Sequence, residues 1–404
     1  MPTTRAFQIV AFDEAGEFIG RSGFDSLLAS VETGRPLTDL LIFSHGWKNN
    51  LEDASGLYEE LLAQLENVAV ANPGLRAVGY RALVLGVVWP AKAWDKAANT
   101  GEESVFSDPL DESVYEVLSP DRASPAGFRH DVVRIQQFLL ADRISGVARD
   151  EFLSLLRRHA DVPTLAEDES IFEPEAPAEA LEGLAFEGFS ARDVFRTFTY
   201  WQMKKRSGVI GQVGVRAILA AVQGRFPSAS VHLIGHSFGC KVMLAAAAGP
   251  GVPAPKPVQT LVLLQGALSF EAMAARVGGT AQAGGYRAAL DPSRVDGPIV
   301  ATYSRLDEAC GRAYPLASRV AGQVGELEGL LDRYRALGSV GASGVGEGLE
   351  HQVAMRDVGS PYGFSGRGVW SVNGGDPPSA FITGHGAIRT PQVAWLILSA
   401  LARR

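Results

Sequence analysis

The amino-acid sequence predicts an α/β fold, with helices covering both faces of a mostly parallel central sheet. Three short apolar runs are typical of strands buried on both faces, at 39–44 (DLLIFS), 82–90 (ALVLGVVWP) and 260–268 (TLVLLQGAL). Leucines and valines at helical spacing follow or precede these runs, around 57–65 and 215–222. Alternation of strands and helices favours a parallel sheet flanked by helices.

Composition fits a globular chain with a sizeable core. Of 404 residues, 46% are hydrophobic and 20% are charged. The net charge of -8 and the lack of a long basic run lead us to expect no nucleic-acid partner. No apolar stretch approaches the ~18 residues of a membrane span, and MPTTRAFQIVAF lacks a signal-peptide pattern, so a cytoplasmic location is expected. The oligomeric state is left open.

Two cysteines, Cys240 and Cys310, are too few for a disulfide framework and form no CxxC motif. We interpret them as buried thiols, although each lies three residues beyond a residue assigned below to the catalytic site, and a single bridge between them is left open. No metal and no organic cofactor is expected.

The other elements follow from local patterns. Alternating apolar residues over 7–11, with a turn at 14–16, predict an N-terminal β-hairpin. Thr390-Pro391 is typical of a helix start. We further expect strands at 230–235, 298–304 and 379–384, helices at 240–249, 320–336 and 391–403, and a flexible Gly/Ser loop at 338–348.

A long insertion interrupts this regular order. Residues 95–189 begin with a segment rich in Ser, Asp, Glu and Pro, and carry helical patterns at 131–142 and 150–158. Residues 167–187 hold eight acidic side chains and no basic one, which is typical of a solvated or disordered segment. The core domain is therefore expected to comprise residues 1–94 and 190–404.

The strongest chemical signal is Gly235-His236-Ser237-Phe238-Gly239, which matches G-x-S-x-G between a predicted strand and a predicted helix. In such an elbow the serine sits on a sharp strand-to-helix turn with its hydroxyl at the top of the sheet. The two glycines leave room for the chain crossing, and the helix N-terminus favours negative charge. Ser237 is therefore the predicted nucleophile.

A serine nucleophile needs a base, and the base needs an orienting acid; in this arrangement both follow the serine in the chain. The two histidines downstream are His351, beside the Gly/Ser loop, and His385, in TGHGA before the last helix, and we favour His385. Asp307 follows the strand 298–304 and is the favoured acid. Of the other carboxylates, Asp296 lies at the wrong end of that strand, and Glu308 is the neighbour of Asp307.

The oxyanion hole requires two backbone N–H groups. One is expected from Phe238, directly after the nucleophile, and the other from the loop SHGWKNN, where Trp47 is favoured and Gly46 is the fallback. His45 of that loop is interpreted as structural.

The chain resembles the α/β-hydrolase superfamily in the order and spacing of four motifs: FSHGW at 43–47, GHSFG at 235–239, YSRLD at 303–307 and TGHG at 383–386. The resemblance implies an α/β-hydrolase fold over the core domain and a helical cap or lid at 95–189. It does not select a substrate, because this superfamily includes esterases, lipases, thioesterases, peptidases and acyltransferases. A serine nucleophile disfavours dehalogenases and epoxide hydrolases of this fold, which use aspartate.

The sequence thus predicts a serine esterase or lipase-like enzyme that acts on a small-molecule or polymeric ester through a Ser237–His385–Asp307 triad. Amidase, thioesterase or acyltransferase activity on the same triad is the first alternative, and a non-catalytic binding protein is the second. Candidate substrate-binding residues are Trp89 and Trp94, at the root of the insertion, and His236. For a tryptophan, core packing is the commoner role.

Overall fold

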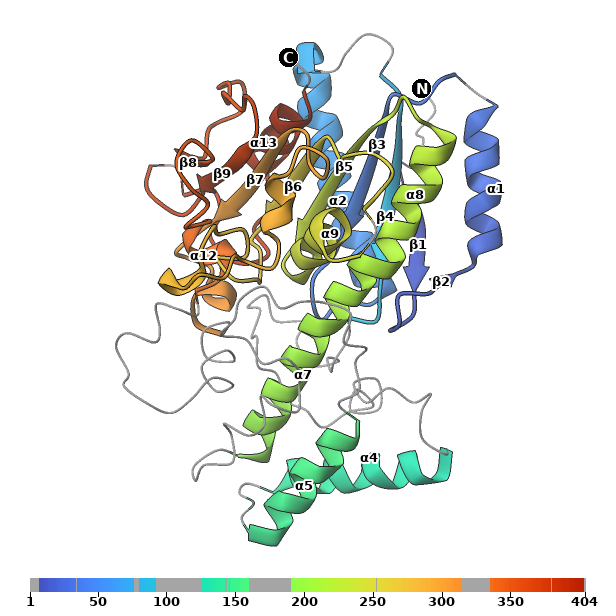
Figure 1. Cartoon of the computed structure of the whole chain (residues 1–404), viewed down its shortest axis with the longest axis vertical. Helices are drawn as coiled ribbons and strands as arrows, with labels where there is room; N and C mark the ends of the chain where they lie inside the picture. The colour runs from blue at the N-terminus through green and yellow to red at the C-terminus, as the bar shows by residue number, and fades with distance from the viewer. Residues whose placement is uncertain are drawn as a thin grey trace.

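A computed structural model describes ten parts of the chain, which Figure 1 colours by residue number. The remaining residues fall outside this description, among them Trp94 and most of the predicted insertion. The described parts are residues 7–33, 35–75, 80–91, 125–141, 144, 146–159, 190–251, 253–313, 335–378 and 380–402.

The described residues form an α/β fold around one nine-stranded sheet, in the order β2-β1-β4-β3-β5-β6-β7-β9-β8. All neighbouring strands are parallel except the predicted hairpin β1–β2. The prediction of a mostly parallel sheet flanked by helices is therefore confirmed. The strands are β1 (Gln8–Phe12), β2 (Phe18–Ile19), β3 (Asp39–Ser44), β4 (Ala82–Val88), β5 (Ser230–His236), β6 (Thr260–Leu264), β7 (Pro298–Tyr303), β8 (Glu350–Ala354) and β9 (Gly368–Asn373).

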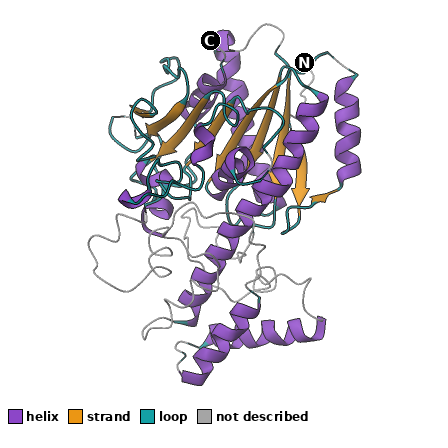
Figure 2. Ribbon diagram, viewed as in Figure 1, coloured by secondary structure: helices purple, strands orange, loops and turns teal. Residues whose placement is uncertain are grey.

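Helices lie on both faces of the sheet (Figure 2), as the apolar strands require, because β3, β5 and β6 are buried along almost their whole length. One face packs against α1 (Arg21–Glu32), α8 (Arg216–Arg225) and α9 (Phe238–Ala248). The other packs against α2 (Leu51–Ala71) and α13 (Pro391–Leu401). Both helices of the second face have side-chain caps: Asn50 and Asp53 form a capping box on α2, and Thr390 caps α13.

A long helix missed by the sequence analysis connects the insertion to the core. Helix α7 (Ala191–Val209) continues through a π-helical stretch (Ile210–Val215) into α8. In Figure 1 it extends from the sheet toward α4 (Pro125–Leu140) and α5 (Gly146–Arg158). These two helices are the described part of the insertion, and both pack against α7. Their function as a cap remains a prediction.

The C-terminal part of the chain corrects two expectations. No strand occupies the described part of 379–384; the strand that precedes His385 is β9. His351, expected beside the Gly/Ser loop, lies in β8 at the sheet edge. The Gly/Ser segment is partly helical, with α12 at Leu337–Val340, and the predicted helix 320–336 falls largely outside the described residues. The short 3-10 helices are Pro73–Leu75, Val277–Gly279 and Arg287–Leu290, and Ala309–Ala313 is π-helical.

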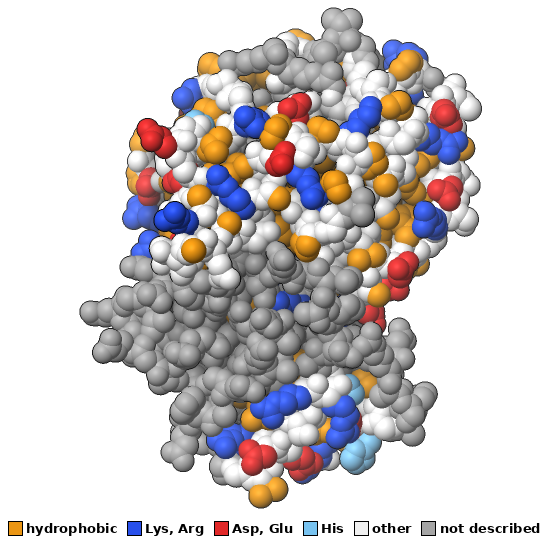
Figure 3. Space-filling model, in the orientation of Figure 1, with side chains coloured by type: hydrophobic (Ala, Val, Ile, Leu, Met, Phe, Trp, Pro, Cys, Tyr) orange, Lys and Arg blue, Asp and Glu red, His pale blue; other side chains and the backbone are white. Residues whose placement is uncertain are grey.

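The surface in Figure 3 bears charged side chains of both signs, interspersed with apolar groups. No helix in the described part of the chain is long and apolar enough to cross a membrane.

Candidate active site

Ser237 occupies the tight turn between β5 and α9. Its backbone angles, φ 56° and ψ -122°, lie where non-glycine residues are rare. The flanking glycines explain how the turn packs: a Cβ on Gly235 would lie 2.3 Å from the Gly239 carbonyl oxygen, and one on Gly239 would lie 2.2 Å from the Ser44 carbonyl oxygen. Only glycine fits at either position, so both glycines of the motif are required by backbone contacts.

The sheet register brings the loop after β3 beside the serine. Ser44 pairs with Gly235 across parallel strands, so Gly46 reaches the level of Ser237. The chain leaves β3 toward α2 on one face and leaves β5 toward α9 on the other face. In α/β sheets, the crevice between two strands whose connections diverge in this way is the usual ligand site.

Two backbone N–H groups lie where these two connections diverge. Phe238 is the first residue of α9, so its N–H has no acceptor within the helix. The Trp47 N–H donates no hydrogen bond to any described residue. The rings of Trp47 and Phe238 lie 6.0 Å apart, and Tyr200 of α7 packs against both, with ring centroids at 6.0 and 5.3 Å. The residues of both predicted oxyanion donors thus belong to one aromatic cluster. Its third member, Tyr200, comes from a helix that the sequence analysis missed.

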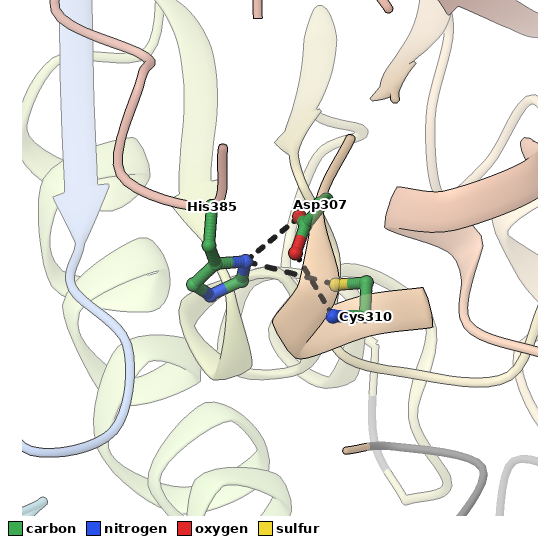
Figure 4. A group of neighbouring side chains, drawn as sticks. All are labelled: Asp307, Cys310 and His385. Atoms are coloured by element: carbon green, nitrogen blue, oxygen red, sulfur yellow. Dashed lines mark hydrogen bonds and ion pairs between the residues drawn. The ribbon is translucent and has the colours of Figure 1, made fainter. Parts of the chain in front are cut away.

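Asp307 and His385 are directly hydrogen-bonded. His385 Nδ1 donates to Asp307 Oδ2 at 2.8 Å (Figure 4). Asp307 lies just beyond β7 and is fully buried, whereas the alternative acid Glu308 is exposed. The loop that carries His385 is fixed to the same strand end, because Ser304 Oγ donates to the Ile382 carbonyl at 2.7 Å.

The Asp307 carboxylate accepts two more hydrogen bonds. Gln265 Nε2 donates to Oδ2 at 2.8 Å, and the Cys310 N–H donates to Oδ1 at 2.9 Å. Burial acts to raise the pKa of Asp307, but the charge and hydrogen bond of His385, with the other two donors, outweigh it and lower the pKa. Asp307 is therefore held as an anion facing the imidazole.

His236 stands between β5 and the His385 loop. Its Nε2 donates to the His385 carbonyl oxygen at 3.0 Å, and the two rings lie 4.9 Å apart. Burial, followed by the charge of His385, lowers the pKa of His236 to about 3, so the ring is neutral. The sequence suggested substrate binding for His236; the structure shows that it holds the backbone of the candidate base.

Trp89 and His45 pack under the loop after β3. Their rings stack at 5.5 Å, the Trp89 indole N–H donates to the His45 carbonyl at 3.3 Å, and Trp89 is buried. This corrects the expectation of Trp89 as a pocket residue and agrees with its alternative role in core packing. His45 Nδ1 donates to the Gly46 carbonyl, and burial lowers the pKa of His45 to about 4. A neutral His45 therefore shapes the loop after β3.

The alternative base His351 lies elsewhere. It stacks on Trp370 of β9 at a ring distance of 4.1 Å, on the edge strand β8. A surface hollow lined by residues 353–357 and Ser360 adjoins this edge and contains none of the predicted catalytic residues. The geometry favours His385, which bonds Asp307.

The donor atoms of Asp307, Cys310 and His385 lie within 4.8 Å of one another, a set that zinc accepts. Zinc would need the Cys310 thiolate, but burial and then the Asp307 charge raise the pKa of this thiol well above its usual value. The hydrogen bond between Asp307 and His385 also occupies the atoms that a metal would take. The set therefore fits an acid–base pair better than a metal centre. Cys240 and Cys310 are both buried free thiols.

Sequence reasoning missed Gln265 and Tyr200. Gln265 follows directly on Leu264, at the C-terminal end of the strand beside β5, and a polar residue at that position was an available signal. Tyr200 carried no such signal.

Comparisons with protein-family models, curated proteins and solved structures find no match to this chain.

Proposed function

We propose that this chain is a serine hydrolase of the α/β-hydrolase fold that cleaves carboxylic esters. The observation that carries the proposal is the buried Asp307 beyond β7, bonded to His385 at 2.8 Å, in a loop that His236, the residue before the strained Ser237, also bonds at 3.0 Å. The strand order supports it as well, because the nucleophile follows a central parallel strand and the base precedes the last helix.

In the proposed reaction, Ser237 Oγ attacks the ester carbonyl carbon while His385 Nε2 takes the hydroxyl proton. Asp307 fixes the tautomer that presents Nε2 and stabilises the imidazolium. The N–H groups of Trp47 and Phe238 stabilise the oxyanion. His385 returns the proton to the leaving alcohol as the acyl-enzyme forms, and a water molecule, activated by the same histidine, then releases the acid and regenerates Ser237.

Amide hydrolysis, thioester hydrolysis and acyl transfer to another acceptor would use the same triad, because they differ only in the leaving group or the acceptor. Rates with matched ester, amide and thioester substrates separate them. A binding protein without turnover is the alternative from a different class, and it gives no explanation for the buried, ionised Asp307 beside His385.

The deciding experiment is fluorophosphonate labelling, followed by a chain-length series of p-nitrophenyl esters. We expect the label on Ser237, and we expect Ser237→Ala to lose labelling and about 10^4-fold in kcat. Ser55→Ala, which changes a half-buried serine of α2, is the matched control. If wild-type protein took up no label and hydrolysed no ester, the proposal would be wrong.

A further inference from the structure

Gln265 is a buried amide at the end of β6, between the strand that carries Ser237 and the strand that precedes Asp307. Its Nε2 donates to Asp307 Oδ2 at 2.8 Å and to the Gly338 carbonyl at 3.0 Å. Both partners are acceptors only, so the amide NH2 must face them. The amide orientation is therefore fixed by its neighbours.

The backbone of Gln265 is strained into position. Its φ is 47°, a left-handed value that is uncommon for a residue with a side chain. The Gln265 N–H donates to Thr302 Oγ1 of β7 at 3.0 Å, which anchors this conformation. Gln265 Oε1 is buried and accepts no hydrogen bond from the described residues. Strain and an unsatisfied buried oxygen are features that cluster at functional sites.

The two hydrogen bonds on Asp307 Oδ2 act together. His385 Nδ1 and Gln265 Nε2 both donate to this oxygen, each at 2.8 Å, while the Cys310 N–H holds Oδ1. The backbone donor restrains one carboxylate oxygen, and Gln265 restrains the other, which is the oxygen that accepts from the imidazole. A carboxylate held at both oxygens keeps its plane fixed relative to the ring.

We infer that Gln265 is a positioning residue, which orients the Asp307 carboxylate toward His385 through the Nε2–Oδ2 hydrogen bond. The inference rests on the proposed function. Among the described residues Gln265 bonds Asp307 but neither Ser237 nor His385, so it acts through Asp307. Its removal should therefore lower kcat and leave KM nearly unchanged.

The test compares two substitutions of similar size. Gln265→Met removes the donor at every pH, and we expect a loss of about 10- to 100-fold in kcat, as for one hydrogen bond to a charged group. Gln265→Glu restores a donor only while the introduced carboxyl group shares a proton with Asp307. We divide kcat/KM of each variant by kcat/KM of wild type at the same pH. This ratio should fall for Gln265→Glu as the pH rises from 5 to 8, whereas it should stay constant for Gln265→Met.

Gln223→Met is the matched control, because Gln223 is also buried and bonds both backbone groups of Lys256. It should lower stability and leave kcat unchanged. A Gln265→Met enzyme with wild-type kcat, or a pH-independent ratio for Gln265→Glu, would overturn the inference. If Gln265→Met does not fold, the Gln265→Glu ratio decides alone.

A readout without turnover separates this inference from the proposed function. The proton shared by His385 and Asp307 should give a low-field proton NMR signal in wild type without substrate. Gln265→Met should shift or broaden it, and Gln223→Met should not. A changed signal in a protein that hydrolyses no ester would contradict the proposed function alone; an unchanged signal in an active enzyme would contradict the positioning role alone.

Discussion

Gly46 lies so close to Ser237 that a Cβ at residue 46 would stand 2.5 Å from Ser237 Cβ and 2.9 Å from Ser237 Oγ. Gly46→Ala must therefore move the loop after β3 away from the nucleophile, together with the Trp47 N–H. Because loss of one oxyanion donor lowers kcat by about 10^2- to 10^3-fold, we expect a decrease of that size. Steady-state kinetics with a p-nitrophenyl ester measure it.

Gly56→Ala is the control for this substitution. A Cβ at residue 56, on helix α2, meets nothing within 4 Å. Alanine there should stabilise the protein by about 0.5–1 kcal/mol through helix propensity and leave kcat unchanged. Wild-type kinetics in Gly46→Ala would show that the loop after β3 does not contribute to the site.

The backbone strain at Ser237 predicts that glycine at this position gives a more stable protein than alanine. At φ 56° and ψ -122° a side chain is unfavourable by about 1–3 kcal/mol, and glycine removes this strain. After the entropic cost of glycine, about 0.5–1 kcal/mol, Ser237→Gly should be more stable than Ser237→Ala by about 1 kcal/mol. Urea unfolding of both inactive variants measures the difference. Equal stabilities would mean that the elbow is not strained.

The elements that the sequence predicted well are determined by residues close together in the sequence. Strands β3, β4 and β5 are apolar because both faces are buried, and the G-x-S-x-G turn needs glycines for contacts within a few residues. Asp307 could be predicted because it follows β7 at the edge where the parallel strands end, and His385 because it precedes the last helix.

The predictions that were missed or wrong depend on contacts between segments that are distant in the sequence. Helix α7 carries buried apolar side chains at helical spacing, at Val194, Phe198 and Trp201, but buried polar residues such as Thr199, Gln202 and Lys204 are interspersed with them and obscure the pattern. The segment before His385 looked like a strand because Ile382 is apolar. In the structure Ile382 is buried in a loop, its N–H donates to the Gly374 carbonyl, and its carbonyl accepts from Ser304. Contacts between distant segments are invisible to local periodicity.

The two downstream histidines should differ sharply in function. His385 bonds Asp307, so His385→Ala should be nearly as damaging as Ser237→Ala, and the double variant little worse, because a triad acts as a unit. His351 stacks on Trp370 at the sheet edge, so His351→Ala should change kcat less than about twofold while lowering stability slightly. Single-turnover rates of the four proteins measure this. Additive losses, or severe loss in His351→Ala, would refute the assignment of the base.

The fold keeps His45 and His236 neutral, and this should make the stability of the protein sensitive to acid. The pKa of His45 is lowered to about 4, against a reference value of 6.5, because burial disfavours the charged ring. Below pH 6.5 the unfolded chain binds a proton at this residue that the folded chain does not. The free energy of unfolding therefore falls as the pH falls from 6.5 to about 4 and is fully retained above pH 7.

From these values His45 alone should lower the free energy of unfolding by about 2 kcal/mol between pH 7 and pH 5. His236, with its pKa lowered to about 3, adds a loss of the same sign. Asp307 does not contribute between pH 7 and pH 5, because its lowered pKa affects stability only below its usual value near 3.8.

His45→Gln retains one donor and one acceptor without titrating, so it should lose less stability between pH 7 and pH 5. His130→Gln is the control, because the His130 side chain is 81% exposed. Urea unfolding at the two pH values gives the result, and an equal decrease in wild type and His45→Gln would show that His45 is not held neutral by the fold.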